Sequence, residues 1–297
     1  MMRKPVFTGA ATAIVTPFDD KGIDYETFDK LIDFQIKNNI SALVVCGTTG
    51  ESSTMTDEER TNTIWYAVKR VKGRIPVIAG TGSNNTAHAV RLSQDAQEVG
   101  ADALLVVTPY YNKATQEGLI SHYTEIAKNT DIPIIMYNVP SRTGVNISPE
   151  TCRVLSGIDN ICGIKEASGS LTAAAEIMRL CGDDFYVYSG NDDIILPMLS
   201  VGACGVISVL SNIRPQETGN ICRLFESGKT KEARVLQLKL MPLIKALFSE
   251  VNPIPVKAAL AEMGFGGMNL RPPLYGIQKD NLERLIRAMQ LTVNESA

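Results

Sequence analysis

Short runs of apolar residues recur along the chain at near-even spacing, and a stretch with helical periodicity follows each run. The runs are AATAIVTPF, SALVVCGTTG, IPVIAGTGS, ADALLVVTPYY, IPIIMYNVPS, ICGIKEAS, FYVYSGND and ACGVISVLS. They are apolar on both faces, as parallel strands buried between helices must be. Eight strand–helix units in about 225 residues predict a (β/α)8 TIM barrel. A doubly wound sheet is the structural alternative, but even spacing from end to end favours closure.

The helix that should follow the second run carries two local signals. Thr56 and Glu59 have the spacing of a capping box at a helix start. Ile64, Trp65 and Val68 then fall on one face of the predicted helix. We therefore expect this helix to begin near Thr56 and to bury that face against the barrel.

The pattern changes after residue 229. The segments KEARVLQLKLMPLIKALFSE, PVKAALAEMG and QKDNLERLIRAMQLT have helical character, with no strand-like run between them. We expect two parts: a catalytic barrel over residues 1–229 and a helical C-terminal extension over residues 230–297, packed against the barrel.

Composition narrows the possible function. The chain has 297 residues, 44% of them hydrophobic, and a formal net charge of −3. Such a chain suits one large soluble domain with an ample core. The charge is spread evenly, so no basic patch indicates nucleic acid. The apolar runs are too short to cross a membrane, and the N-terminus lacks the long apolar stretch of a secretory signal.

Cysteines and histidines favour a cytoplasmic protein without a metal. The six cysteines form no C-x-x-C pair, so we interpret them as reduced thiols. The only two histidines, His88 and His122, lie far apart in predicted helices, which argues against a zinc site. We expect neither a metal nor a cofactor.

Polar residues gather where the predicted strands end. Active sites of such barrels lie at the C-terminal ends of the strands. The second, fourth, fifth and sixth strands end in CGTTGES, TPYYNK, MYNVPSRTG and GIKEAS. Together these motifs place seven polar residues on one rim: Thr48, Thr49, Tyr110, Tyr111, Tyr137, Arg142 and Lys165.

Lys165 stands near the end of an apolar strand. If its side chain points inward, Gly163 and Ala167 do so as well, and these two small residues should leave space around the amine. Tyr137, on the adjacent strand, should reach the same space. A neutral amine in a partly dry pocket attacks a carbonyl to form a Schiff base. This electron sink replaces a metal in aldol chemistry, and the Tyr137 phenol supplies the proton transfers that it needs.

Two features suit carboxylates. GTTGE is a glycine-flanked turn toward a helix, and its N–H groups and threonine hydroxyls fit a small carboxylate. Arg142 is a planar bidentate carboxylate binder. Each residue alone has a structural explanation, such as an ion pair for Lys165 or a core position for Tyr137. Their joint placement points instead to an α-keto acid and a second acidic substrate.

The motifs GTTGES, PYYNK, YNVPSRTG and GIKEAS, in this order, closely resemble the dihydrodipicolinate synthase (4-hydroxy-tetrahydrodipicolinate synthase) family of pyruvate-dependent class I aldolases. The resemblance runs from GAATAIVTPF to LRPPL. It implies that Lys165 forms the Schiff base with pyruvate and that Tyr137 donates and accepts protons. It also implies that Thr48 links Tyr137 to Tyr111, which reaches in from a neighbouring subunit, and that Thr49 holds the pyruvate carboxylate.

The same resemblance implies the rest of the reaction. The enamine would attack aspartate 4-semialdehyde, whose carboxylate Arg142 would receive, on the route to diaminopimelate and lysine. Gly190 and Ile207 would form the pocket wall. Members of the family are typically homotetramers built as dimers of dimers, and some are dimers.

One region departs from the members that lysine inhibits. Residues matching their lysine pocket are Ser52, Asn84 and Tyr110. His88, however, stands where those members often carry glutamate, and Asp57 and Arg60 stand where they often carry histidines. A missing carboxylate with a cation nearby weakens binding of ammonium groups. We predict weak or absent inhibition by lysine.

Three alternatives stay open at this point. One is a related pyruvate aldolase that cleaves N-acetylneuraminate or a 2-keto-3-deoxy sugar acid, although Arg142 favours a shorter acidic substrate. Another is a phosphate-binding barrel, with SGND and SVLSN as weak candidate loops. The third is a catalytically silent barrel that binds keto acids.

Overall fold

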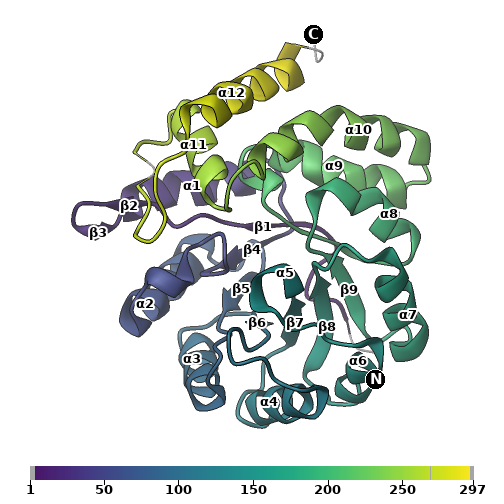
Figure 1. Ribbon diagram of the computed structural model, residues 1–297. Helices are drawn as coiled ribbons and strands as arrows, with labels where there is room; N and C mark the ends of the chain where they lie inside the picture. Colours follow the sequence, from purple (N-terminus) through teal and green to yellow (C-terminus); the bar gives the residue numbers. More distant parts are fainter. Residues whose placement is uncertain (1–3, 268, 295–297) are drawn as a thin grey trace.

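The computed structural model describes residues 4–267 and 269–294. Eight parallel strands close into a barrel in the order β1-β10-β9-β8-β7-β6-β5-β4, as the spacing of the apolar runs predicts. Helices surround the barrel (Figure 1). The barrel strands are β1 Gly9–Ala13, β4 Ala42–Val45, β5 Val77–Gly80, β6 Ala103–Val107, β7 Ile134–Asn138, β8 Ile161–Glu166, β9 Tyr186–Ser189 and β10 Gly205–Ser208.

The outer ring has one main helix after each barrel strand. These helices are α1 Tyr25–Lys37, α2 Asp57–Val71, α3 Thr86–Glu98, α4 Gln116–Lys128, α6 Pro149–Leu155, α7 Leu171–Cys181, α8 Ile195–Ser200 and α9 Pro215–Glu226. Smaller elements lie in the loops: the hairpin β2 Phe18–Asp19 and β3 Gly22–Ile23, the short helix α5 Pro140–Thr143, and the 3-10 turns η1 Ser52–Thr54, η2 Asp192–Ile194 and η3 Leu210–Asn212.

The predicted helix start after β4 is confirmed, and one packing expectation is wrong. Thr56 and Glu59 form both hydrogen bonds of the capping box at the start of α2. Ile64 is buried, but the Trp65 side chain is 46% exposed. Trp65 lies beside the buried stripe because residues spaced by three and four positions, not adjacent ones, share a helix face.

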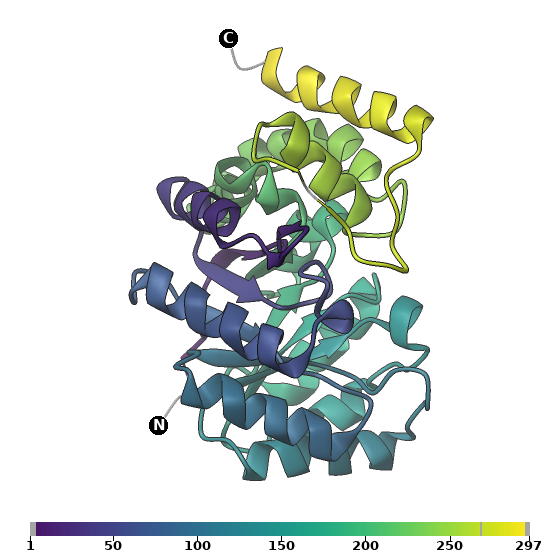
Figure 2. The ribbon, with the colours of Figure 1, turned by 90° about the vertical axis from the view of Figure 1, so that its left-hand side faces the viewer.

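Three further helices follow the barrel: α10 Thr230–Leu247, α11 Ile254–Glu262 and α12 Lys279–Asn294. They lie together at one edge of the molecule, with α12 outermost (Figure 2). The segment between α11 and α12 meets the loop after β4, where the Arg271 N–H donates to the Glu51 carboxylate. We propose residue 229 as the boundary between barrel and C-terminal extension, because α9 ends the ring at Glu226 and α10 begins at Thr230.

Two apolar layers hold the barrel together. The inner layer fills the barrel with residues that include Ala11, Val44 and Ile135. The outer layer lies between strands and helices, where Leu43 and Ile164 meet the buried helix faces. A strand residue belongs to one layer or the other because successive side chains point to opposite faces. Within the described part of the chain, no helix is long and apolar enough to span a bilayer.

Candidate active site

Lys165 lies on β8 directly opposite Tyr137 on β7, since these two residues are Cα partners in the parallel ladder. This pairing confirms the expectation that the fifth and sixth barrel strands, β7 and β8, are adjacent. The Lys165 side chain is only 5% exposed, and its Nζ lies 4.4 Å from the centroid of the Tyr137 ring. On the other side of β8, Lys165 is the partner of Tyr188. The amine is therefore held between two tyrosine-bearing strands.

The small residues around Lys165 act differently from the sequence-based expectation. A Cβ on Gly163 would lie 2.2 Å from the Tyr186 carbonyl oxygen, and one on Gly190 would lie 2.4 Å from the Ala167 Cβ. These glycines do not leave open space, because neighbouring backbone and side-chain atoms occupy it. Instead they permit β8 and β9 to approach closely, which fixes the strand that carries Lys165.

The loop after β4 carries the two threonines of the GTTGE motif. Thr48 is half-buried and Thr49 is buried. The Thr16 hydroxyl donates to the Gly50 carbonyl at 2.8 Å, and Asn252 Nδ2 donates to Thr49 Oγ1 at 2.9 Å. The turn is thus held by the loop after β1 on one side and by the C-terminal extension on the other.

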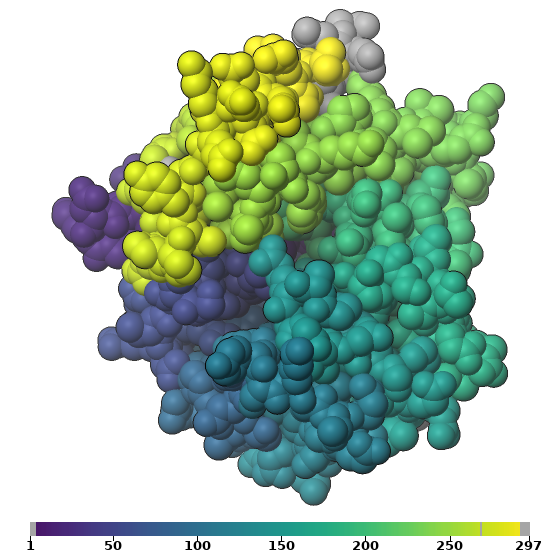
Figure 3. Space-filling view, viewed as in Figure 1, coloured from purple at the N-terminus to yellow at the C-terminus, as the bar shows by residue number. Residues whose placement is uncertain are grey.

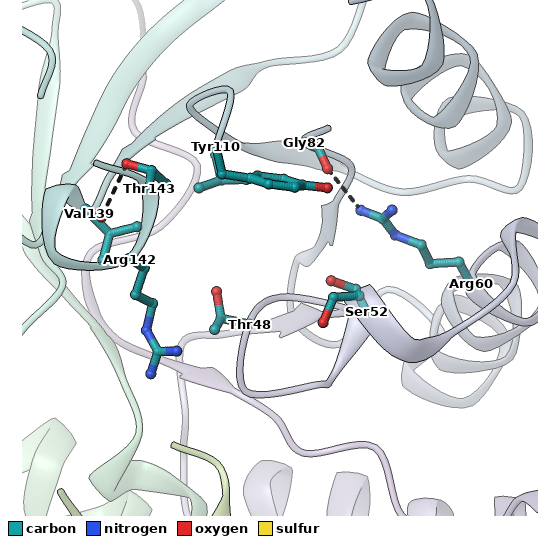
Figure 4. A pocket seen from close by; sticks show the side chains of 10 residues that line it. Thr48, Ser52, Arg60, Gly82, Tyr110, Val139, Arg142 and Thr143 are labelled. Carbon is teal, nitrogen blue, oxygen red and sulfur yellow. Dashed lines mark hydrogen bonds between the residues drawn. The ribbon is translucent and has the colours of Figure 1, made fainter. Parts of the chain in front are cut away.

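A pocket of about 240 Å³ opens above this loop. Its lining residues come from the ends of β4, β5, β6 and β7, from the loops after them and from Arg60 of α2, on the face of the molecule that Figure 3 shows. Figure 4 shows Arg142 at one end of the pocket and Arg60 at the other, with Thr48 and Ser52 between them and Tyr110 along one side. A second, smaller space of about 40 Å³ is lined by both Thr48 and Tyr137. This volume is enough for a water molecule between the two hydroxyl-bearing residues.

Arg142 reaches the larger pocket from the short helix α5. Pro140 begins that helix and Gly144, at φ 71°, caps its C-terminus, so Arg142 lies within its single turn. The Arg142 side chain is exposed, and its Nη2 donates to the Asn252 carbonyl at 3.4 Å. The guanidinium keeps further donors for a carboxylate in the pocket.

Tyr111 does not meet the other candidate residues within one chain. Its side chain is 89% exposed, and its backbone has φ 74°, a conformation that non-glycine residues rarely adopt. Such strain persists only where the surroundings or a function require it. Tyr110, by contrast, lines the larger pocket.

Comparison with known proteins identifies the family. The model of the dihydrodipicolinate synthetase family matches residues 6–292. The chain belongs to this family. It is 56% identical over 286 residues to the 4-hydroxy-tetrahydrodipicolinate synthase of Caldicellulosiruptor saccharolyticus, covering 96% of this chain and 97% of the relative. It is 55% identical over 282 residues to the synthase of Thermoanaerobacter sp. strain X514, with 95% of each chain covered.

Solved structures agree with the sequence relatives. The crystal structure of dihydrodipicolinate synthase from Thermotoga maritima matches with a TM-score of 0.95 at 44% identity, covering 97% of this chain and 99% of that one. The resemblance found in the four motifs is therefore confirmed at the level of the family and of the barrel fold.

The two residues expected to form the pocket wall, Ile207 and Gly190, lie on β10 and just after β9. Ile207 is fully buried in the inner layer, opposite Ala11 on β1. Gly190 N donates to the Glu166 carbonyl at 2.7 Å, which ties the end of β9 to the end of β8. Both residues lie at or near the C-terminal ends of their strands.

Only some residues of the expected lysine pocket line the 240 Å³ pocket. Ser52 and Tyr110 line the 240 Å³ pocket together with Arg60, whereas Asn84 and His88 do not appear among its lining residues. His88 instead bonds through Nε2 to both Asp57 carboxylate oxygens, at 2.9 and 3.0 Å. This hydrogen bond, and then the Arg91 guanidinium, hold the pKa of Asp57 below its usual range.

Arg60 is the buried cation of this region. Its guanidinium donates to the Gly80 carbonyl from Nε at 3.2 Å and from Nη2 at 2.7 Å. The side chain therefore has a structural role beneath β5, and its charge faces the pocket next to Ser52. A cation at this place repels the ammonium groups of lysine.

Sequence reasoning missed Asp192. Its buried carboxylate accepts hydrogen bonds from the backbone N–H groups of Val209 and Leu210, at 3.0 and 2.9 Å. Burial raises the pKa of Asp192, whereas Ser208, these N–H groups and nearby Lys165 oppose the shift. SGND contains the residue, but only the fold shows that it ties the loop after β9 to the loop after β10.

The residues that line the larger pocket include no histidine and no cysteine. Both histidines lie on helices, as expected, His88 on α3 and His122 on α4. All six cysteines are free thiols, and two of them, Cys181 and Cys204, are half-buried rather than core residues. Across residues 4–267 and 269–294, no group of three or more His, Cys, Asp or Glu is placed to hold a metal ion.

Proposed function

We propose that the Lys165 amine forms a Schiff base with pyruvate. The observation that carries the proposal is the buried Lys165 amine 4.4 Å from the Tyr137 ring, at the end of the barrel where the strands terminate. The protein catalyses the condensation of pyruvate with L-aspartate 4-semialdehyde to 4-hydroxy-tetrahydrodipicolinate, the activity for which its relatives are named. This reaction is a step of lysine biosynthesis through diaminopimelate.

The chemistry requires several proton transfers near one nitrogen. The amine adds to the pyruvate ketone to give a carbinolamine, which loses water to give the imine. Loss of a methyl proton gives the enamine, whose carbon attacks the aldehyde. Tyr137 is the donor and acceptor for these steps, and Thr48 carries the proton onward across the 40 Å³ space that both residues line.

The two substrates carry a carboxylate each, and the site offers two places for them. Thr49 holds the pyruvate carboxylate at the loop after β4. Arg142 receives the carboxylate of the semialdehyde in the larger pocket, where the guanidinium lies beside Thr48. Gly190 and Ile207 form the wall of the pyruvate half.

Tyr111 completes the relay from a second copy of the chain. The Tyr111 side chain is 89% exposed, and its backbone has a strained φ. Among the described residues of one chain, we find no contact of this side chain that would explain the strain. We place its hydroxyl in the partner's site, next to the partner's Thr48. A homotetramer built as a dimer of dimers, located in the cytoplasm, is the assembly that we propose.

The expected regulatory pocket belongs to the same proposal. Ser52, Asn84 and Tyr110 match the pocket residues of lysine-inhibited members of the family, and His88 stands where those members often carry glutamate. Here His88 is engaged with Asp57, and the Arg60 cation lies beside Ser52. This arrangement supports weak or absent inhibition by lysine.

The alternatives fit the site less well. A phosphate-binding barrel needs free backbone N–H groups in the loops after its last strands. In this chain the N–H groups of Val209 and Leu210 donate to Asp192. A sugar-acid aldolase needs hydroxyl-binding groups beyond the reacting carbon, where this pocket presents the Arg142 guanidinium.

A steady-state assay separates these functions. The enzyme is offered pyruvate with aspartate 4-semialdehyde and, in parallel, N-acetylneuraminate for cleavage. We expect turnover of the first pair, little or no cleavage of the second substrate, and loss of turnover in Lys165→Ala. Faster cleavage of N-acetylneuraminate would favour the sugar-acid aldolase. No turnover of either would favour a silent or phosphate-binding barrel.

A further inference from the structure

Asn252 brings the C-terminal extension into contact with both carboxylate-binding residues. It lies between α10 and α11 and is buried. Its side-chain Nδ2 donates to Thr49 Oγ1 at 2.9 Å, across 203 positions of sequence. Its backbone carbonyl accepts from Arg142 Nη2 at 3.4 Å. One residue therefore serves the two halves of the site with different atoms.

The segment that carries Asn252 is fixed to the same loop at other points. The Lys257 ammonium forms a buried ion pair with Glu51, two residues beyond Thr49. The Arg271 backbone N–H donates to the Glu51 carboxylate at 3.2 Å. Lys257 Nζ also donates to the Asn269 carbonyl at 2.7 Å. These bonds give the extension a defined position relative to the GTTGE turn.

Arg271 adds an anchor on the helix that follows the turn. Its guanidinium bonds to both oxygens of the Glu59 carboxylate, at 2.6 and 2.7 Å, and Glu59 is the glutamate of the capping box of α2. Bidentate contacts of this type restrict orientation as well as distance. Thr49 is thus approached by an Asn252 side chain that has little freedom to move.

The hydrogen bond from Asn252 decides how the Thr49 hydroxyl is used. A hydroxyl has one proton to donate and two lone pairs with which to accept. Because Nδ2 is a donor only, Thr49 Oγ1 must accept at this contact. Its proton is then left for another acceptor, and a carboxylate bound at the turn is an acceptor only.

We propose that Asn252 is a positioning residue for the pyruvate carboxylate: it orients the Thr49 hydroxyl so that its proton points to the substrate. This inference rests on the proposed function of Thr49. The buried Asn252 Oδ1 has no hydrogen-bond partner among the described residues. Buried polar atoms without a partner are rare in native proteins, and each calls for an explanation. The C-terminal extension is, in this account, part of the active site.

Three variants of the full-length enzyme test the inference by steady-state kinetics with each substrate varied. Asn252→Ala removes the donor to Thr49, and we expect the pyruvate KM to rise about threefold to tenfold, as for loss of one neutral hydrogen bond. The KM for aspartate 4-semialdehyde should stay unchanged, because Arg142 contacts the backbone carbonyl that every variant keeps. A fall in both affinities together would indicate general damage to the site.

Asn252→Asp provides a nearly isosteric second variant. A carboxylate here accepts the Thr49 proton and repels the pyruvate carboxylate, so the pyruvate KM should rise more than in Asn252→Ala. Asn281→Ala is the matched control: this asparagine of the same extension donates to the Glu250 carboxylate at 2.8 Å, away from the turn. Its two KM values should equal those of the wild type.

Trapping with borohydride distinguishes failure of the role proposed for Asn252 from failure of the proposed function itself. If the wild type forms a pyruvate adduct on Lys165, and folded Asn252→Ala and Asn252→Asp keep the wild-type pyruvate KM, the role of Asn252 is overturned while the proposed function stands. If the wild type forms no adduct, the proposed function and this inference are both overturned.

Discussion

The Lys165 amine lies 4.4 Å from the centroid of the Tyr137 ring, and the two residues face each other across β7 and β8. This relationship follows from the register of two parallel strands, so it is as rigid as the barrel itself. A nucleophilic amine and a phenol held at this distance can exchange protons with a substrate bound between them and the GTTGE turn.

Replacing Tyr137 by phenylalanine should lower kcat by about 100-fold to 10,000-fold, the usual effect of losing a positioned acid or base. The ring stays, so Lys165 keeps its packing and stability should change little. Tyr188→Phe is the matched control, because Tyr188 is the other partner of Lys165 but its hydroxyl donates to the Phe7 carbonyl. We expect Tyr188→Phe to lose stability and keep most of its kcat. Equal losses of kcat in both variants would contradict the role of Tyr137.

If Tyr111 acts in the active site of the partner subunit, two inactive variants should complement each other. Tyr111→Phe and Tyr137→Phe should each be nearly inactive alone. After denaturation and refolding together in equal amounts, a mixed dimer has one site with both changes and one site with neither. Half of the dimers are mixed and half of their sites are intact, so about a quarter of the wild-type activity should return. No recovery, with mixed dimers shown by native mass spectrometry, would place Tyr111 in its own chain's site.

Lysine should inhibit this enzyme weakly or not at all. The Arg60 guanidinium lies next to Ser52 in the pocket, and His88 is occupied by Asp57. The measurement is the steady-state rate at subsaturating pyruvate with increasing lysine. Substantial inhibition below millimolar lysine would show that ammonium groups find a carboxylate in the assembled pocket.

His122 should make folding stability depend on pH. Burial lowers the pKa of His122 from 6.5 to about 4 in the folded state. Between these values the unfolded chain binds more protons, so stability is present above pH 6.5 and is lost as the pH falls toward 4. The loss attributable to His122 is about 2 kcal/mol between pH 7 and pH 5.

Urea unfolding of the wild type and of His122→Gln at both pH values measures this loss. The variant should lose about 2 kcal/mol less between pH 7 and pH 5 than the wild type. His122 Nδ1 is 3.0 Å from the Thr86 hydroxyl, so the variant is expected to be somewhat less stable at pH 7. Parallel curves for the two proteins would contradict the shifted pKa.

Much of the fold could be predicted because its signals are local. Each barrel strand is a buried apolar run, and the capping box of α2 needs only residues three positions apart. The pairing of Tyr137 with Lys165 was also predictable, since consecutive strands of such barrels are neighbours. Trp65 was assigned to a buried face wrongly because a short apolar cluster does not define the centre of the stripe.

The rest of the site depends on contacts between distant segments. Asn252 lies between two helices with no pattern of its own, and only the folded chain brings it to Thr49. The space expected at Gly163 is filled by the Tyr186 backbone, which no residue of β8 reveals. The roles assigned to Thr48, Thr49, Tyr111 and Arg142, and the boundary at residue 229, stay predictions.

The most direct measurement of the central claim is a borohydride trap. The enzyme is incubated with pyruvate, reduced with borohydride, digested and mapped by mass spectrometry, with a sample lacking pyruvate as the control. We expect a pyruvate-dependent adduct on Lys165, and none on the buried Lys257. No adduct, or an adduct on a different lysine, would contradict the Schiff-base mechanism.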